Sequence, residues 1–216
     1  VGKSTVAREV AHRLGLDYLD TGAMYRAVTL KLIRSQVDLE NRVELEQVLE
    51  QIKIDLKTGA SGSIVLLDGE DVTAEIRKPY VNQAVSEVSC ISIIRRKMVA
   101  LQREIACRSP GIVVEGRDIC SRVLPEATHK FFLEASLSER ASRRWKEQVA
   151  CGMKVPLSQV KEEIEKRDRI DSQRQDSPLM VAPGVTLIDT TELSLEEVID
   201  SILSIVTDSG AAVEGE

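Results

Sequence analysis

The first residues of the chain form a glycine-lysine-serine-threonine run of the kind that binds phosphate groups. Val1-Gly2-Lys3-Ser4-Thr5 matches the end of the pattern G-x-x-x-x-G-K-[ST], whose earlier positions would lie ahead of residue 1. Backbone amides at the start of a helix donate to phosphate oxygens, and the helix dipole favours an anion there. We expect Lys3 to neutralise nucleotide phosphates and Ser4 to bind Mg²⁺. The alternative is a glycine that caps a helix beside an ordinary surface lysine.

A second polar group, Asp20-Thr21-Gly22-Ala23-Met24-Tyr25-Arg26, lies between an expected strand at 16–19 and an expected helix at 23–33. Arg26 lies about one helical turn beyond the turn residues, so its guanidinium can face a phosphate bound there. A capped helix that carries a solvated arginine is an equally good interpretation of these residues alone.

A third group, Glu115-Gly116-Arg117-Asp118, follows a short apolar strand expected at 112–114. In phosphate-binding α/β proteins, a carboxylate at the end of such a strand orders the Mg²⁺ shell through water. We expect this role for Glu115, phosphate binding by Arg117 and a hydrogen-bond acceptor at Asp118. The alternative is a turn with a surface ion pair, which contributes little stability.

Two charged helices, expected at 138–150 and 158–174, concentrate arginines late in the chain. These are Arg140, Arg143 and Arg144 on the first helix and Arg167 and Arg174 on the second, with Asp171 between the last two. A solvated pair of helices joined by ion pairs explains this pattern as well as catalysis does. Beside a phosphate-binding loop, the pair indicates a lid that brings guanidinium groups to a transferring phosphoryl group.

Short apolar strands alternate with amphipathic helices along the chain. Strands are expected at 16–19, 112–114, 131–133 and 185–188, and further helices at 5–14, at 45–52, from 79 to 108 with a break near Ile91, and from Leu195. This alternation predicts an α/β fold with a parallel, doubly wound sheet. Ligands of such sheets bind beyond the carboxyl ends of the strands, where the polar motifs lie.

Residues 52–76 interrupt this alternation. Apolar and polar residues alternate at 52–56, a turn-rich link follows at 58–62, and a second strand is expected at 64–67. We therefore expect a small antiparallel β insert within the α/β chain. Residues 207–216 are small and acidic, and we expect a disordered tail there.

The composition limits the partners of the chain. A net charge of −6 argues against a surface that coats nucleic acid, so any bound anion must be held by a local cluster of Arg and Lys. No apolar run approaches the roughly 18 residues that span a bilayer. The four cysteines show no C-x-x-C spacing and there are two histidines, so we expect reduced thiols and no zinc site. We expect a cytoplasmic monomer without nucleic-acid or membrane partners.

The order of these motifs resembles that of the bacterial-type cytidylate kinases, from residue 1 to about 206. The matching stretches are L-D-T-G-A-M-Y-R at 19–26, D-G-E-D-V-T at 68–73 with Ile76-Arg77, V-S-x-V-S at 85–89, G-R-D at 116–118, E-R-x-x-R-R at 139–144, and R-D-x-x-D-x-x-R-x-x-x-P-L at 167–179. Other nucleoside monophosphate kinases share the phosphate loop and the lid arginines but lack the insert.

The resemblance implies a P-loop nucleoside monophosphate kinase fold, in which helices flank a parallel sheet. It implies one kinase domain at 1–206, with an acceptor-binding region at about 34–96 that contains the β insert and a helical lid at about 143–165. The substrates would be ATP with Mg²⁺ and CMP or dCMP, and the products ADP and CDP or dCDP.

The resemblance also assigns roles to single residues. ATP would be bound by Val1, Gly2, Lys3, Ser4, Thr5, Arg140 and Arg144, with Arg140 stacked on adenine. CMP would be bound by Thr21, Tyr25, Arg26, Ser86, Arg95, Arg117, Asp118, Arg167, Asp171 and Arg174. The catalytic cations would be Lys3, Arg117, Arg144, Arg167 and Arg174, and the Mg²⁺ ligands Ser4 and, through water, Glu115.

The cytosine assignment agrees with the chemistry of the base. Cytosine has an amino donor at N4, which suits Asp118, and acceptors at N3 and O2, which suit Arg95 or its neighbour Arg96. Uracil would place a carbonyl against the carboxylate, a mismatch that gives strong discrimination. Phosphoryl transfer needs alignment and charge neutralisation, so we expect direct in-line attack, without a nucleophile or an obligatory base, after the lid has closed.

Two other interpretations stay open. One is a different small-acceptor kinase, acting on dTMP, AMP or shikimate, against which the insert and the V-S-x-V-S stretch argue. The other is a nucleotide-binding fragment without activity. The strand that normally precedes a phosphate loop lies centrally, between 112–114 and 131–133, and its absence would leave a gap that hydrogen bonds cannot bridge. We therefore expect the first central strand to be missing and the chain as written to be poorly folded or inactive.

Overall fold

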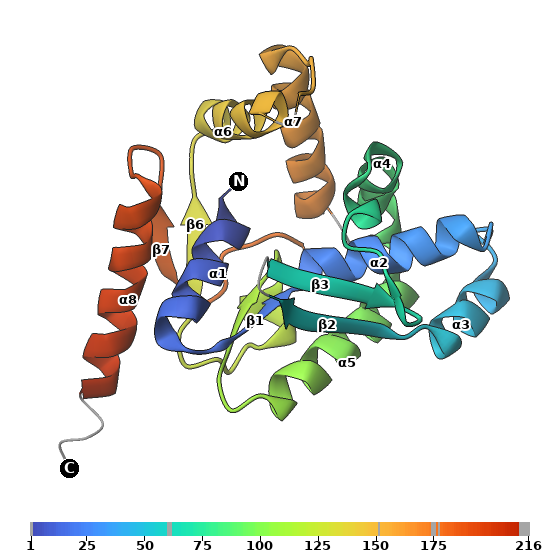
Figure 1. The fold of residues 1–216 in the computed structure, drawn as a ribbon, viewed down its shortest axis with the longest axis horizontal. Coiled ribbons are helices and arrows are strands. Elements are labelled where there is room, and N and C mark those ends of the chain that lie inside the picture. The colour runs from blue at the N-terminus through green and yellow to red at the C-terminus, as the bar shows by residue number, and fades with distance from the viewer. Residues whose placement is uncertain (1, 60–61, 151, 174–175, 177, 212–216) are drawn as a thin grey trace.

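The computed structural model describes residues 2–59, 62–150, 152–173, 176 and 178–211 as an α/β protein (Figure 1). Val1 and Arg174, both expected in the site, lie outside these residues. No helix in this part of the chain is long and apolar enough to cross a membrane.

The parallel strands form two separate pairs. Strand β1 (Asp17–Asp20) pairs with β5 (Ile112–Glu115), and β6 (Phe131–Glu134) pairs with β7 (Thr186–Asp189). Within the described ranges no hydrogen-bonded strand joins β5 to β6. The structure thus has the parallel strands and helices that the sequence predicts, with the parallel strands in two separate pairs among these residues.

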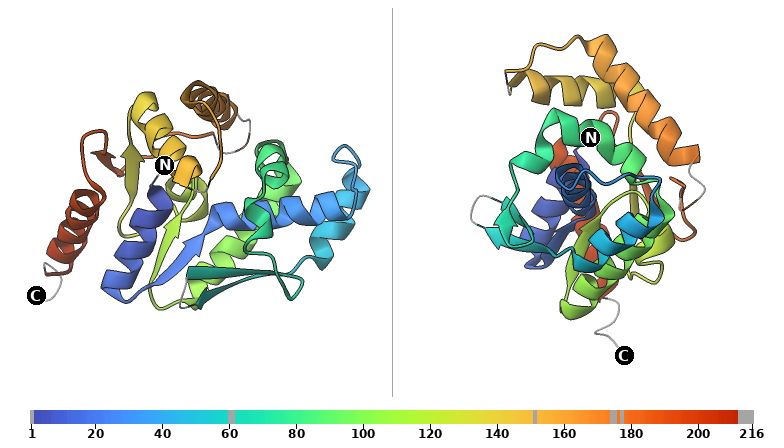
Figure 2. Two further views of the ribbon diagram at one scale, coloured as in Figure 1. Left: turned by 45° about the horizontal axis from the view of Figure 1, so that its top comes forward. Right: turned by 90° about the vertical axis from the view of Figure 1, so that its right-hand side faces the viewer.

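Helices α1 (Lys3–Leu14) and α8 (Leu195–Ala211) pack together beside these strands (Figure 2). Their shared apolar cluster contains Val6 and Val10 of α1 and Val198, Ile199 and Ile202 of α8. A capping box opens α8, since Ser194 N donates to Glu197 Oε2 at 2.8 Å and Glu197 N donates back to Ser194 Oγ at 3.3 Å.

Helix α8 continues further than the sequence suggested. The expectation of a disordered tail at 207–216 is wrong for residues 207–211, which are helical. Val206 packs against the apolar cluster of α1 and α8, and the Thr207 hydroxyl donates to Leu203 O at 2.9 Å. These contacts extend the helix through a stretch whose composition indicates disorder. Residues 212–216 lie outside the described part.

Helix α2 (Thr21–Arg34) runs through the larger core. Met24, Ala27, Val28 and Leu30 are fully buried on it. Around them pack residues from the other elements of this half of the molecule, among them Leu19, Leu45, Val65, Ile76, Val81, Ile94 and Met98. This core fixes the helix that begins at the end of β1.

The antiparallel insert consists of β2 (Ile54–Gly59), β3 (Gly62–Leu67) and β4 (Glu70–Asp71), next to α3 (Arg42–Gln51). Val65 and Leu67 of β3 are buried in the core around α2. A short 3₁₀ turn, η1 (Glu75–Arg77), leads out of the insert.

The long helix expected from 79 to 108 is broken, as the sequence suggested. Helix α4 (Pro79–Val88) ends before Ser89, and α5 (Ser92–Arg108) begins after Ile91, whose ψ of 116° is extended. The buried Ser89 hydroxyl donates to Ser86 O at 2.9 Å and closes the end of α4.

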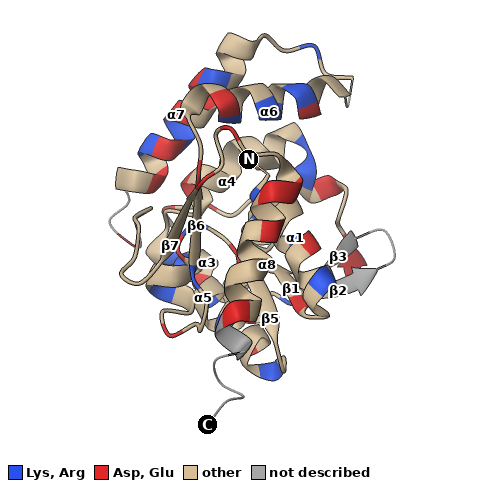
Figure 3. Cartoon of the chain, turned by 90° about the vertical axis from the view of Figure 1, so that its left-hand side faces the viewer, with Lys and Arg blue, Asp and Glu red and all other residues tan. Residues whose placement is uncertain are grey.

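Helices α6 (Leu137–Ala150) and α7 (Leu157–Gln173) form a hairpin that stands above the strands, with acidic and basic residues along it (Figure 3). It has its own small core of Ala141, Val160 and Ile164. The Trp145 indole donates to Val155 O at 2.9 Å and ties the connecting loop to α6. The hairpin therefore has a small apolar core of its own, separate from the core around α2.

Candidate active site

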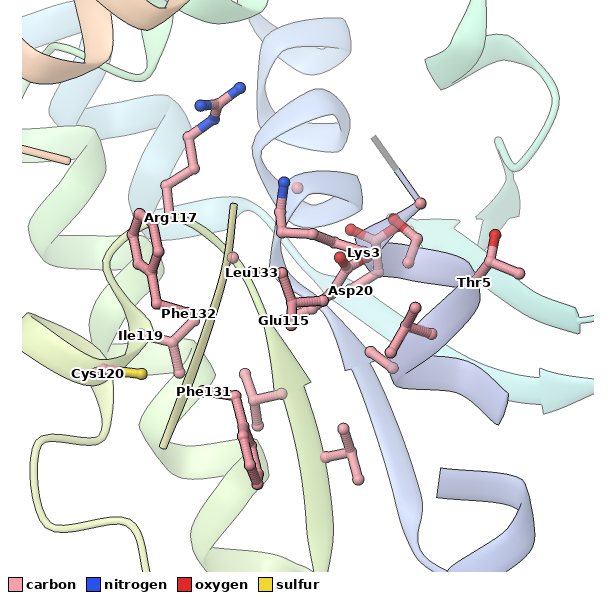
Figure 4. Close-up of a pocket in the computed structure, with 18 of the residues that line it drawn as sticks. Lys3, Thr5, Asp20, Glu115, Arg117, Ile119, Cys120, Phe131, Phe132 and Leu133 are labelled. Carbon is pink, nitrogen blue, oxygen red and sulfur yellow. The ribbon is translucent and has the colours of Figure 1, made fainter. Parts of the chain in front are cut away.

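A large cleft of about 1920 Å³ opens where the carboxyl ends of β1 and β5 face the start of α1 and the hairpin of α6 and α7 (Figure 4). Its charged lining includes Lys3, Arg26, Glu115, Arg117, Arg144 and Arg167. The cleft thus lies where ligands of parallel sheets bind.

Gly2 caps α1 in a backbone conformation that side chains disfavour. Its φ is 85°, in the left-handed region, and its carbonyl accepts from Val6 N at 2.9 Å. Lys3, Ser4 and Thr5 follow in the first turn and all line the cleft. Glycine therefore lets the helix begin with its amides directed at the cleft.

The ends of β1 and β5 are joined by side chains. Thr21 Oγ1 donates to Glu115 O at 2.7 Å, and the Tyr18 hydroxyl donates to Glu115 Oε1 at 2.8 Å. A Cβ at Gly116 would lie 2.4 Å from Thr21 Oγ1, so only glycine fits there. Burial, together with the Glu115 charge, raises the pKa of Tyr18. Glu115 is thereby held at the edge of the cleft.

Positive charge is crowded at the same end of the cleft, where Figure 4 shows the Lys3 ammonium and the Arg117 guanidinium. Burial and the Arg117 charge lower the pKa of Lys3 to about 8. Burial, again with the Arg117 charge, lowers the pKa of Arg167 to about 10. Burial also lowers the pKa of Arg26. These buried cations repel each other, so an anionic ligand that binds among them would stabilise their charged forms.

Two aspartates of α7 pair with the surrounding arginines. Arg117 Nη1 lies 2.8 Å from Asp171 Oδ2 and 3.8 Å from Asp168 Oδ1. Arg140 Nη1 of α6 donates to Asp168 Oδ2 at 2.5 Å. Arg167 Nε lies 4.0 Å from Asp171 Oδ2. Asp168 therefore lies between Arg117, which follows β5, and Arg140 of α6.

Several neighbours of the site were not expected from the sequence: Tyr18, Asn82 and Asp168. Asn82 Oδ1 accepts from Arg26 Nε at 3.2 Å and its amide donates to Arg77 O at 2.8 Å. Asp168 directly follows Arg167 and lies three residues before Asp171, so helical spacing alone would have placed it on the face of Asp171. Tyr18 and Asn82 carry no such local signal.

A buried ion pair lies beside the cleft. Arg95 Nη2 pairs with Asp118 Oδ2, and the two side chains are 3% and 6% exposed. Arg95 Nη1 also donates to Ser89 O at 3.0 Å, and the guanidinium carbon lies 5.6 Å from the centre of the Tyr25 ring. Arg96 is exposed, so Arg95 is the arginine that faces inward.

The remaining expected residues divide into two groups. Arg140, Arg143 and Arg144 all line the cleft, and Arg143 also donates to Thr190 O at 2.5 Å. Ser86 is half-buried on α4, and its carbonyl accepts from Cys90 Sγ at 3.2 Å. The structure thus gathers the phosphate-type cations at the cleft but does not place Ser86 in its lining.

A glycine-lysine helix start, a carboxylate at a strand end and converging guanidinium groups define a P-loop phosphotransferase site. Among the described residues, no group of three or more His, Cys, Asp or Glu side chains could hold a metal ion. A Mg²⁺ ion would therefore need oxygen ligands from a bound phosphate as well as from the protein, which is its usual arrangement.

Comparison with known proteins identifies the family. The family model described as cytidylate kinase matches residues 1–208, and the chain belongs to this family. It is 49% identical to the cytidylate kinase of Caldanaerobacter subterraneus subsp. tengcongensis over 93% of this chain and 88% of that protein. It is 47% identical to the cytidylate kinase of Geobacillus kaustophilus (96% and 92% covered) and 45% identical to that of Bacillus cereus (95% and 91% covered).

The lowered pKa of Lys3 predicts a pH-dependent affinity for ATP. Bound phosphates would raise the Lys3 pKa from about 8 towards its ordinary value, so binding takes up a proton above that pH. The affinity of Mg²⁺-free ATP should therefore fall as the pH rises through about 8, by up to about tenfold per pH unit. Isothermal titration calorimetry in buffers of different ionisation enthalpy measures both effects.

Two variants control this experiment. Lys3→Met should bind ATP more weakly and without the pH dependence. Lys31→Met, which removes a lysine paired with Asp68 at 2.7 Å outside the cleft, should behave like the unmodified chain. An affinity that stays constant between about pH 7 and about pH 9 would show that Lys3 does not titrate in the site.

Proposed function

We propose that this chain transfers the γ-phosphoryl group of ATP to CMP or dCMP. The observation that carries the proposal is the convergence of Lys3, Arg117 and Arg167 at one end of the cleft, next to the buried Arg95–Asp118 pair. The first group suits phosphates, and the second suits a base with one donor and two acceptors on its edge. The relatives named cytidylate kinase support the same assignment.

On the ATP side, the amides and side chains of Gly2 to Thr5 would hold the β- and γ-phosphates. Arg140 and Arg144 of α6 would contact the adenine and the phosphates, since α6 forms one wall of the cleft. Ser4 would bind Mg²⁺ directly and Glu115 through water. The Glu115 carboxylate suits this role, because Tyr18 fixes it close enough to Lys3 to influence the lysine charge. Mg²⁺, when bound, would neutralise phosphate charge.

On the acceptor side, Arg26, Arg117 and Arg167 would bind the CMP phosphate. Arg26 and Arg167 lie close enough for their charges to influence each other. Thr21 and Tyr25 would shape the site from α2, Ser86, Arg95 and Asp118 would read the cytosine edge, and Asp171 would contact the ribose. Arg174 would join the phosphate-binding arginines.

The mechanism needs no covalent intermediate. A CMP phosphate oxygen would attack the γ-phosphorus in line, while Lys3, Arg117, Arg144, Arg167 and Arg174 neutralise the oxygens of the transferring group. The hairpin of α6 and α7 would act as the lid. Its closure would bring Arg140 and Arg144 to the phosphates and exclude water that would otherwise hydrolyse ATP.

We also propose that one further parallel strand lies between β5 and β6 in the active enzyme. The cleft of about 1920 Å³ exceeds the roughly 300–1,000 Å³ of ordinary ligand sites. Part of the volume beyond that range is lined by apolar residues of α1, β5 and β6, namely Val6, Val10, Val113, Phe131 and Leu133. A strand there would satisfy two unpaired edges and cover this apolar surface.

A panel of nucleoside monophosphates tests the proposed reaction. CMP and dCMP should be phosphorylated with the highest kcat/KM, and UMP, AMP and dTMP at about one hundredth of that value or less, because their edges mismatch Asp118 and Arg95. Coupled measurement of ADP release gives the rates. AMP or dTMP reacting faster than CMP would contradict the cytidylate assignment.

Asp118→Asn provides the site control for the panel. The amide keeps the shape but loses the charge that pairs with the cytosine amino group. Its kcat/KM for CMP should fall about 100-fold, and the preference for CMP over UMP should shrink. A melting curve must accompany this variant, since Arg95 loses its buried partner.

Asp168→Asn should slow phosphoryl transfer. Asp168 pairs with Arg140 and lies near Arg117, so its loss leaves Arg140 without its ion-pair partner, while Arg117 keeps Asp171. We expect kcat to fall about tenfold, or about 1.4 kcal/mol, with KM values within about threefold. Asp168→Glu should recover part of the rate. Glu104→Gln, which breaks an exposed ion pair with Arg108, is the matched control. An unchanged kcat for Asp168→Asn would refute the role of Asp168 in phosphoryl transfer.

A strand added ahead of residue 1 tests the proposed central strand, because the start of α1 lies at the carboxyl ends of β5 and β6. An added segment of about six valine and isoleucine residues with a short glycine linker should raise the melting temperature by about 10 °C and increase turnover. The same extension with two prolines cannot pair with both edges and should do neither. Equal effects of the two extensions would refute the proposal.

A further inference from the structure

Asp176, which follows α7 in the chain, contacts the start of α5. Ser92 Oγ, in the first turn of α5, donates to Asp176 Oδ2. Leu179 N donates to Asp171 O at 2.8 Å and returns the chain to the end of α7. Asp176 therefore lies in the chain between Asp171 and Leu179, which contact each other, and it is itself bonded to a different part of the molecule.

The contact with Asp176 gives the start of α5 a carboxylate, which the residues next to the helix in sequence do not provide. The residue before the helix is Ile91, whose side chain cannot accept a hydrogen bond, and no side chain caps the helix locally. A helix start has unsatisfied amides and favours negative charge. The Asp176 carboxylate, bonded to the first helical residue, places negative charge at this position from another segment.

The two ends of the connection lie at the two halves of the acceptor site. Arg95 is one turn inside α5, where its amide donates to Ile91 O at 3.0 Å and its guanidinium pairs with Asp118. Asp171, at the other end, pairs with Arg117 at 2.8 Å. The Ser92–Asp176 bond thus links the helix that carries Arg95 to the part of the chain that follows Asp171.

We propose that Ser92 and Asp176 are positioning residues of the acceptor site: their hydrogen bond sets the position of α5, which carries Arg95, relative to the end of α7, which carries Asp171. This inference rests on the proposed function, in which the ion pairs of Arg95 and Asp171 bind the base, ribose and phosphate of CMP. Ser92 acts through α5, which carries Arg95, and Asp176 follows Asp171 by five residues in the chain. The loss of their bond should weaken acceptor binding without affecting ATP.

The other end of α5 provides a matched comparison. Ser109, which caps the end of α5, donates through its hydroxyl to Asp17 Oδ2 at 2.6 Å. This is again a serine–aspartate bond that ties α5 to a distant segment. Asp17 begins β1, whereas the site lies at its other end, beyond Asp20. A purely structural role would make the two bonds equivalent.

A double-mutant cycle tests the proposal. Ser92→Ala and Asp176→Asn should each raise the KM for CMP about fivefold, with the KM for ATP within about twofold. The double variant should match the single variants, because all three lack the same bond. Ser92→Thr keeps the hydroxyl and should restore the KM for CMP. Ser109→Ala should lower the melting temperature at most, with the KM for CMP unchanged.

The outcomes separate the inference from the proposed function. Three results would overturn the positioning role while the unmodified chain still phosphorylates CMP. These are additive effects of the two substitutions, an unchanged KM for CMP in the single variants, and an equal rise of the KM for CMP in Ser109→Ala. Absence of CMP turnover in the wild type would contradict the proposed function itself. The shift in melting temperature that CMP induces compares CMP binding among the variants without requiring turnover. A variant that has lost activity can therefore still be tested.

Discussion

The arrangement depends on holding several cations together at one edge of two strands. The chain as a whole is acidic, with a net charge of −6, so this positive field is local. Burial and mutual repulsion lower the pKa of Lys3 and Arg167, which means that the folded protein stores unfavourable charge there. Asp168 and Asp171 offset part of it. Phosphate groups can offset the rest, so ligand binding relieves a cost that folding has imposed.

That balance bears on the hairpin of α6 and α7, two charged helices that we propose to act as the lid. Its own core of Ala141, Val160 and Ile164 makes it rigid, while Arg140 and Asp168 meet Arg117 by ion pairs that solvent can partly replace. Apolar packing between lid and core would resist opening. Ion pairs among partly exposed groups contribute little net stability, so phosphates can compete for the same guanidinium groups.

Much of the site could be predicted because its residues follow strands or begin helices, as Lys3, Arg26 and Arg117 do. The break near Ile91 was equally local. Asp168 was missed because a carboxylate on a charged helix resembles a solvated one until the fold brings Arg140 against it. Tyr18 depends on the register that places Asp20 opposite Glu115, which no local period encodes. The helical residues 207–211 were missed because their stability comes from the packing of Val206 against distant residues, while their composition indicates disorder.

Specificity has a different physical origin from phosphate binding. Asp118 is buried and fixed by Arg95, which is fixed in turn by Ser89 O and the Tyr25 ring. The cost of desolvating this carboxylate is incurred on folding, before any nucleotide arrives. In the proposed complex, a cytosine amino group would then gain a hydrogen bond to a preorganised acceptor. A uracil carbonyl would face the same carboxylate, which its packing prevents from turning away, so the mismatch cannot relax. The rigidity of the Arg95–Asp118 pair, more than its charge, is what would turn a one-atom difference between bases into discrimination.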